Sequence, residues 1–211
     1  MDSTIRNVWL LNISTFFFFL GISVVTPVVS PFLVSLRAEP FLVGLITGVT
    51  SALSLISKPI GGVVGDRGYR FHALVGGNLF GALAGILYVV SAHSGNLYLF
   101  AIARAIHGFS MGLFFPSSLS TAVDLAPVGR VGETLGWRGM MFSLGNIIGP
   151  GIGGYTSDRI GFMGAFSLTV LFSLTGAIFA LMAWREVGDT VERIERGKAS
   201  HRGLLRVTFV S

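Results

Sequence analysis

The chain alternates long apolar stretches with short polar ones. Six stretches are each long enough to cross about 30 Å of hydrocarbon as an α-helix that rises about 1.5 Å per residue. Polar and charged residues separate the stretches. The pattern therefore predicts six transmembrane helices, at residues 8–30, 41–63, 73–92, 97–118, 133–157 and 162–184.

The composition agrees with a membrane environment. The 211 residues are 52% hydrophobic and only 12% charged, with a mean hydropathy of +0.75. A soluble domain carries about 25% charged residues. Too few polar residues remain to cover a folded surface, so the lipid bilayer is the expected partner. We predict an all-α membrane protein whose residues 1–184 form one transmembrane bundle. The first stretch is too long for the apolar core of a signal peptide, and we expect it to be retained.

Positive charges predict the orientation of this bundle. Arg37 and Arg159 fall on one side, and Lys58 and Arg104 lie within predicted spans. Every other Lys and Arg falls on the opposite side: Arg6, Arg67, Arg70, Arg130, Arg138, Arg185, Arg193, Arg196, Lys198, Arg202 and Arg206. Cytoplasmic loops are enriched in Lys and Arg. The protein is therefore expected to be multi-pass in the cell (plasma or inner) membrane, with both termini in the cytoplasm.

The net charge of +5 does not predict a nucleic-acid partner, because the basic residues follow the topology instead of gathering on one face. Residues 185–211 are expected to form a basic cytoplasmic tail that suits an anionic leaflet. Glu192 and Arg196 have helical i,i+4 spacing, which favours a surface helix over part of this tail. The apolar piece Gly203–Val210 is expected to lie on the membrane.

Several kinds of chemistry have no support in the sequence. There is no cysteine, which excludes disulfides, thiol catalysis and cysteine-based metal sites. We find no His, Asp and Glu cluster with metal-ligand spacing, no nucleophile–base pair and no phosphate-binding loop. The sequence therefore predicts no enzyme activity, no catalytic residue, no metal and no cofactor.

A short pattern occurs twice. Gly61–Arg67 ends the second predicted span, and Gly153–Arg159 ends the fifth; both segments read G-G-x-x-x-D-R. A proline stands upstream of each, at Pro59 and Pro150. Because three spans separate the two copies, they are expected on opposite sides of the membrane. This arrangement is typical of the inverted repeats that build many secondary transporters. The alternative is a coincidence between two glycine-rich helix ends.

The fifth span carries a regular spacing of small residues, here called the glycine ladder: Gly136, Gly145, Gly149, Pro150, Gly153 and Gly154. Gly145, Gly149 and Gly153 lie four residues apart and so share one helix stripe, where a neighbouring helix can approach closely. Pro150 removes a backbone donor and bends the helix. The ladder predicts either tight packing alone or, additionally, a hinge or seal in a conformational cycle.

Four motifs together resemble the amino-terminal six-helix half of the major facilitator superfamily. Gly62–Arg70 is similar to the loop motif G-x-x-x-D-R-x-G-R-R, although Tyr69 replaces its second glycine and Phe71 its last basic residue. The tight turn is therefore expected to use Gly68. Arg104–Gly112 resembles the R-x-x-x-G motif of span four, and Asp124–Arg130 the charged pair that follows it. The glycine ladder resembles the antiporter motif of proton-coupled exporters at all six positions.

The resemblance implies half of a major-facilitator fold, made of two inverted three-helix repeats. It further implies half of a secondary active transporter that exports small organic molecules by proton antiport with alternating access. The second six-helix half would come from the rest of the same chain, from a split partner or from a second copy. Two alternatives remain: a non-transporting or remnant six-span subunit, and a symporter or uniporter half for a polar metabolite.

The resemblance also implies a cytoplasmic gate network. Asp66, Arg67, Arg70, Asp124 and Arg130 would form a charge cluster that holds the inner gate closed. By the same resemblance, Asp66 would approach the start of a helix in the other half, where a carboxylate is stabilised. The alternative is a set of solvated loop anchors that only enforce topology.

Candidates for the substrate or proton pathway lie within the spans. A charge at depth, such as Arg104, marks a functional site by default. His107 lies on the same helix face and can change charge at physiological pH; it is otherwise a neutral packing residue. Asn12 and Asn146 either contact substrate or brace helices. No Asp or Glu lies near the middle of a span, so His107 carries the proton, or a carboxylate elsewhere does, or coupling is not to protons.

Overall fold

The computed structural model describes the backbone of residues 3–208, and side chains over 4–65 and 67–185. The helices are α1 (Ser3–Ser35), α2 (Pro40–Val64), α3 (Arg70–Ser94), α4 (Leu97–Asp124), α5 (Val131–Ile160) and α6 (Phe162–Thr208), and the short π-helical segment η1 (Gly65–Tyr69) joins α2 to α3. The described backbone contains no strand, and the all-helical prediction is confirmed.

The helices extend beyond the predicted apolar spans, because backbone hydrogen bonding continues into polar residues. The clearest case is α6, which runs on without a break to Thr208, past the predicted boundary at residue 184. The predicted basic tail is therefore helical in its backbone up to that residue. Its side chains, and the expected membrane contact of Gly203–Val210, lie outside the described part.

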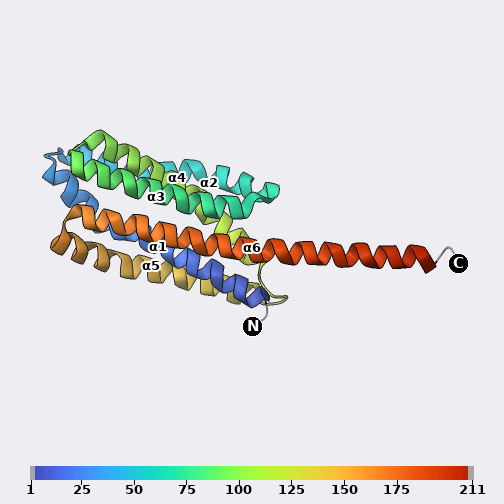
Figure 1. The fold of residues 1–211 in the computed structure, drawn as a ribbon. Coiled ribbons are helices and arrows are strands. Elements are labelled where there is room, and N and C mark those ends of the chain that lie inside the picture. Colours follow the sequence, from blue (N-terminus) through green and yellow to red (C-terminus); the bar gives the residue numbers. More distant parts are fainter. Residues whose placement is uncertain (1–2, 209–211) are drawn as a thin grey trace.

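Within the described residues, five helices are long and apolar enough to cross a membrane: α1, α2, α3, α4 and α6. The sixth predicted span falls on α5, which has 30 residues, ample for crossing. Glycine, serine, threonine and charged residues lower its hydropathy. Placing α5 across the membrane therefore rests on its packing along α1, visible in Figure 1, rather than on hydropathy.

Neighbouring helices follow the spatial order α2, α4, α3, α6, α1, α5, each packing extensively on the next. The contacts of α1 with α2 and with α4, and of α4 with α5, are sparse. In Figure 1, the amino terminus, the α2–α3 turn, the α4–α5 connection and the extension of α6 all lie at the same end of the bundle. This shared end corresponds to the predicted cytoplasmic side.

The packing has the symmetry of an inverted repeat. Exchanging α1–α3 with α4–α6 converts the α1–α5 interface into the α4–α2 interface, and α1–α6 into α4–α3. The contacts of the two G-G pairs correspond in the same way. A Cβ on Gly61 would meet the α4 backbone at Gly112, and one on Gly153 would meet the α1 backbone at Val24. The second glycine of each pair, Gly62 or Gly154, faces open space.

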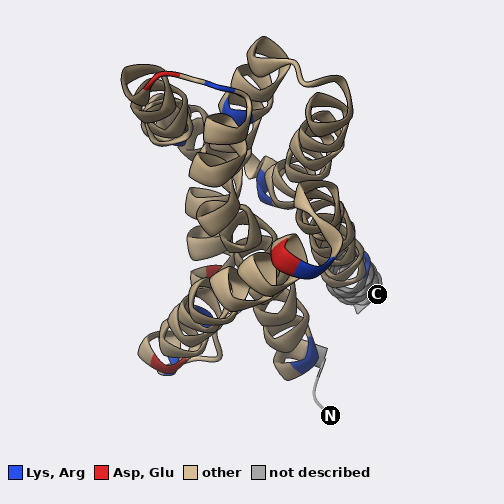
Figure 2. Cartoon of the chain, turned by 90° about the vertical axis from the view of Figure 1, so that its left-hand side faces the viewer, with Lys and Arg blue, Asp and Glu red and all other residues tan. Residues whose placement is uncertain are grey.

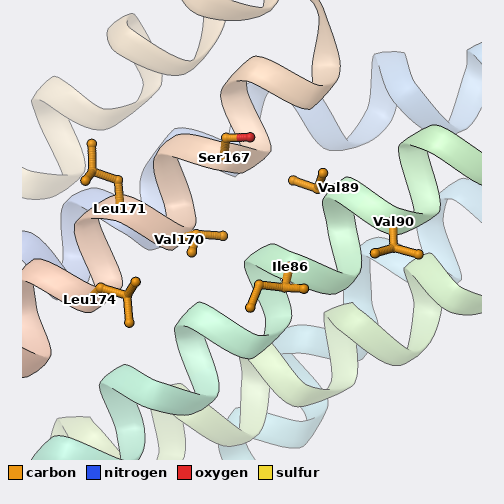
Figure 3. Close-up of a pocket in the computed structure, with 7 residues that line it drawn as sticks. All are labelled: Ile86, Val89, Val90, Ser167, Val170, Leu171 and Leu174. Carbon is orange, nitrogen blue, oxygen red and sulfur yellow. The ribbon is translucent and has the colours of Figure 1, made fainter.

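The outer face between α3 and α6 carries a shallow apolar groove of about 430 Å³. Figure 3 shows its lining side chains, which come from both helices: Ile86, Val89, Val90, Ser167, Val170, Leu171 and Leu174. Serine supplies the only hydroxyl, and no lining side chain is charged. Such a surface suits lipid acyl chains and offers no group for chemistry.

The turn between α2 and α3 depends on Gly68, whose φ is 87°. The expectation that the turn uses this glycine is confirmed.

A Cβ at the positive φ of Gly68 is disfavoured by about 1–2 kcal/mol. We expect Gly68→Ala to lower the thermal unfolding temperature in detergent. Gly62→Ala, which places the same methyl group in open space on a helix, is the matched control and should leave that temperature unchanged. Equal effects of the two substitutions would contradict a strained turn.

Candidate functional site

A charge cluster lies at the end of the bundle that holds the amino terminus. Arg70, the first residue of α3, forms an ion pair with Asp124, the last residue of α4. Its Nε also donates a hydrogen bond of 3.2 Å to the carbonyl of Gly65 in η1. One guanidinium thereby ties the α2–α3 turn to α4. The side chains of Arg70 and Asp124 are 29% and 52% exposed, so solvent screening leaves the pair a small share of folding stability.

Other members of the predicted gate network are placed differently. Arg130, expected beside Asp124, instead binds Glu133 in the first turn of α5 through two hydrogen bonds of 2.7 Å. The hydrogen bonds that the Arg130 guanidinium donates to the Glu133 carboxylate raise the pKa of this guanidinium above its usual value. Arg67 is exposed, and the side chain of Asp66 lies outside the described part.

Glu133 was missed as a partner, although its i,i+3 spacing from Arg130 was available in the sequence. Figure 2, a view along the bundle, shows that Lys, Arg, Asp and Glu colour only short parts of an otherwise tan ribbon. Because the charged residues are few, they mark specific contacts, and the surface as a whole is not polar.

Arg104 joins α4 to α2. Its Nη2 donates a hydrogen bond of 2.8 Å to the carbonyl of Thr47, and its own carbonyl accepts one of 2.9 Å from the Thr50 hydroxyl. The buried Nε has no hydrogen-bond partner. The side chain thus serves helix packing and still presents a donor inside the bundle.

His107 lies one turn further along α4 and is only 1% exposed. Its Nδ1 lies 3.1 Å from the hydroxyl of Tyr88 on α3, and its Nε2 has no partner. The pair is surrounded by the aromatic side chains of Phe100 and Phe166, which contact Tyr88. This deep, apolar setting is compatible with either of the two roles predicted for His107.

The predicted asparagines have unlike environments. Asn146 on α5 is exposed; its Oδ1 accepts a hydrogen bond of 2.8 Å from Ser23 on α1, and its Nδ2 donates one to the carbonyl of Phe142. Asn12 on α1 is 1% exposed, and neither of its amide atoms has a hydrogen-bond partner. Asn146 therefore braces two helices at the surface, whereas Asn12 has unused hydrogen-bonding capacity inside the bundle.

The glycine ladder divides into two faces. Gly145, Gly149 and Gly153 press against α1: a Cβ on Gly149 would lie 2.5 Å from that of Ser23, and one on Gly145 would lie 2.9 Å from the Leu20 nitrogen. Gly136 and Gly154 have nothing within 4 Å. Gly136 instead lines a hollow on α5, together with Trp137 and Met140. The ladder therefore forms one close helix contact and leaves an unoccupied surface on the same helix.

Sequence reasoning missed a cation at the junction of α4 and α5. Arg138, counted only toward orientation, is 4% exposed and reaches from α5 to α4. Its Nε and Nη2 donate hydrogen bonds of 3.1 and 2.6 Å to the Ser118 hydroxyl, and Nη2 donates a third, of 3.3 Å, to the Phe115 carbonyl. The ammonium nitrogen of Lys58 on α2 lies 5.4 Å from the ring centroid of Phe115.

The described side chains contain no group of three His, Cys, Asp or Glu residues that could hold a metal ion. What they do contain is a helical bundle with inverted symmetry, close glycine contacts, charges at one end and isolated polar groups at depth. These features define the class of secondary transporters. The sequence profile of the Major Facilitator Superfamily matches residues 11–210, and the chain belongs to that family.

Two curated relatives are resistance proteins by name. The chain is 28% identical over 170 residues to Quinolone resistance protein NorA of Staphylococcus aureus, covering 79% of this chain and 43% of that protein. It is 29% identical over 183 residues to Multidrug resistance protein 1 of Bacillus subtilis (strain 168), covering 86% and 46%. The chain thus spans about half the length of the curated relatives it matches.

Solved structures give the same fold. A peptide transporter, POT, determined in complex with sulfate, matches with a TM-score of 0.77 at 17% identity, over 95% of this chain and 45% of that one. The proton:xylose symporter XylE matches with a TM-score of 0.69 at 15% identity, over 87% and 45%. At these identities the likeness concerns the fold alone. Both matches confirm the predicted half of a major-facilitator fold.

Proposed function

We propose that this chain forms one half of a secondary transporter that exports small organic molecules in exchange for protons. The observation that carries the proposal is the glycine ladder of α5 packed on α1, where three glycines in register allow near backbone contact. No side chains interlock at this contact, so the two helices can tilt without side chains having to separate. The names of the two curated relatives, which refer to quinolone and multidrug resistance, support export of organic solutes.

The second half would cover the faces that α2 and α5 leave open. On α2 a glycine-lined hollow of about 470 Å³ surrounds Gly44 and Gly48. On α5 the hollow beside Gly136 occupies the equivalent place in the inverted repeat. Neither helix packs on the other, and each presents exposed apolar side chains such as Phe41 and Ile147. A second six-helix unit against these faces would enclose a central pathway.

The charge cluster would act as the cytoplasmic latch of this carrier. Arg70 holds the α2–α3 turn to the end of α4, and Arg130 with Glu133 holds the start of α5. When the pathway opens to the cytoplasm, we expect the Arg70–Asp124 pair to separate. Its exposure makes separation inexpensive, which suits a contact that forms and breaks in each cycle.

Transport in proteoliposomes tests this proposal. The chain, together with any second half encoded with it, is reconstituted with an imposed pH gradient, and a panel of quinolones and aromatic dyes is offered. We expect accumulation of at least one compound that collapses when a protonophore removes the gradient. Accumulation that is indifferent to the gradient would contradict proton coupling, and no accumulation of any compound would contradict export.

A further inference from the structure

We infer that Arg138 and Lys58, which both lie close to the ring of the half-buried Phe115, form a binding site for an organic anion with an apolar aromatic body. The site lies where side chains of α5 and α2 reach the same residue of α4. This inference rests on the proposed transport function for its meaning in the cell, and it names the class of solute that the pathway recognises.

The positive charges of Arg138 and Lys58 are the first feature that favours an anion. The Arg138 guanidinium carbon lies 4.9 Å from the Phe115 ring centroid, and the Lys58 ammonium nitrogen lies 5.4 Å from it. Two cations thus share one ring. Among the side chains that the structure describes, no carboxylate pairs with either of them. Arg138 is buried, whereas Lys58 is exposed. A buried cation without a counter-charge is costly, and an arriving anion relieves that cost at Arg138.

Arg138 also has unused hydrogen-bonding capacity. The three bonds of Arg138 use only Nε and Nη2, and they go to a hydroxyl and a carbonyl. Among the described residues Nη1 has no partner, and it is not among the fully enclosed polar atoms. Ser118 and the Phe115 carbonyl therefore occupy Nε and Nη2, and the two N–H groups of Nη1 remain available. An N–H of this nitrogen can donate a charge-assisted hydrogen bond to one oxygen of a carboxylate or sulfonate.

Depth and lining complete the site. Arg138 lies seven residues after the start of α5 and Lys58 six before the end of α2, so both sit roughly 10 Å from the same end of the bundle. Phe142 of α5 extends the apolar lining: it is half-buried, and its ring centroid lies 6.3 Å from that of Phe115. An aromatic acid would place its ring against Phe115 and Phe142 and its charge beside Nη1 of Arg138 and the Lys58 ammonium group.

Binding of one ring system in three charge states tests the inference. The purified chain in nanodiscs of zwitterionic lipid is titrated with 2-naphthoate, 2-naphthamide and 2-naphthylmethylammonium by equilibrium dialysis. We expect naphthoate to bind at least tenfold more tightly than the other two. Arg138→Gln should weaken naphthoate binding at least tenfold and leave naphthamide unchanged, and Lys58→Gln should weaken it severalfold. Arg159→Gln, an exposed cation at the other end of α5, is the matched control and should change nothing.

Several outcomes would overturn the site. Equal binding of the three compounds, or equal loss of naphthoate and naphthamide binding in Arg138→Gln, would show that Arg138 only holds α5 to α4. If Arg138→Gln does not fold, Lys58→Gln decides alone, and unaltered naphthoate binding there refutes the site. Loss of naphthoate binding in nanodiscs containing phosphatidylglycerol would assign the cations to lipid headgroups instead. Gradient-driven transport of neutral dyes without naphthoate binding would refute only this site, whereas naphthoate binding without any transport would refute only the carrier function.

Discussion

Replacing Gly153 by alanine should destabilise the bundle, although alanine is the better helix former by about 1 kcal/mol. The added methyl group would meet the backbone of α1 at Val24, where no flexible side chain can move aside. Overpacking of this kind costs about 1–3 kcal/mol. We expect a lower thermal unfolding temperature in detergent and a loss of most transport activity.

Gly151→Ala is the matched control for this prediction. It lies two residues away on α5, outside the glycine ladder, and nothing is within 4 Å of its would-be Cβ. The same substitution there should be neutral or slightly stabilising. If both variants unfold at the same temperature, the close contact between α5 and α1 does not carry the packing role assigned to it.

Breaking the Arg70–Asp124 pair should have a different profile, with a small effect on folding and a larger one on transport. Arg70→Gln or Asp124→Asn is expected to shift the unfolding temperature little, because the pair is substantially exposed. An exposed pair stabilises one conformation by up to about 1 kcal/mol, so we expect the transport rate to fall by up to about fivefold. The measurement is the initial rate of gradient-driven uptake in proteoliposomes.

A charge exchange provides the control. The double variant Arg70→Asp with Asp124→Arg restores the attraction while removing both original residues, and it should recover part of the lost rate. The Arg70 side chain also binds the carbonyl of Gly65, so recovery should be incomplete. A double variant no better than either single variant would show that the two residues act separately, as solvated anchors.

Much of this fold could be predicted from hydropathy and spacing. The positions of the helices follow from apolar stretches that are interrupted by polar residues. The repeat of G-G-x-x-x-D-R correctly indicated inverted symmetry, since Gly61 and Gly153 occupy equivalent contacts. Helix ends were less predictable, because hydropathy records where lipid begins and not where backbone hydrogen bonding stops. Hydropathy also fails to identify α5 as a membrane-spanning helix, because its glycines lower the mean hydropathy while they allow close contact with α1.

The candidate site was less accessible from the sequence. A linear pattern gives the face on which a residue lies, but it does not give the neighbouring helix. The bond from Arg138 to Ser118 joins residues 20 positions apart, and the position of Lys58 over Phe115 joins helices that are not consecutive. Arg130 was expected to join Asp124, yet Glu133 is nearer along the helix and gives a two-pronged geometry.

We propose that this chain, as one half of a transporter, takes part in exchanging protons for an organic solute. The most direct test of this proposal records both movements in the same vesicle. Proteoliposomes carry a pH-sensitive dye inside and an imposed pH gradient, and each transported compound is added in turn. We expect a proton flux that starts on addition of solute, opposes the solute flux and weakens in Arg70→Gln. Solute movement with no accompanying proton flux would contradict it.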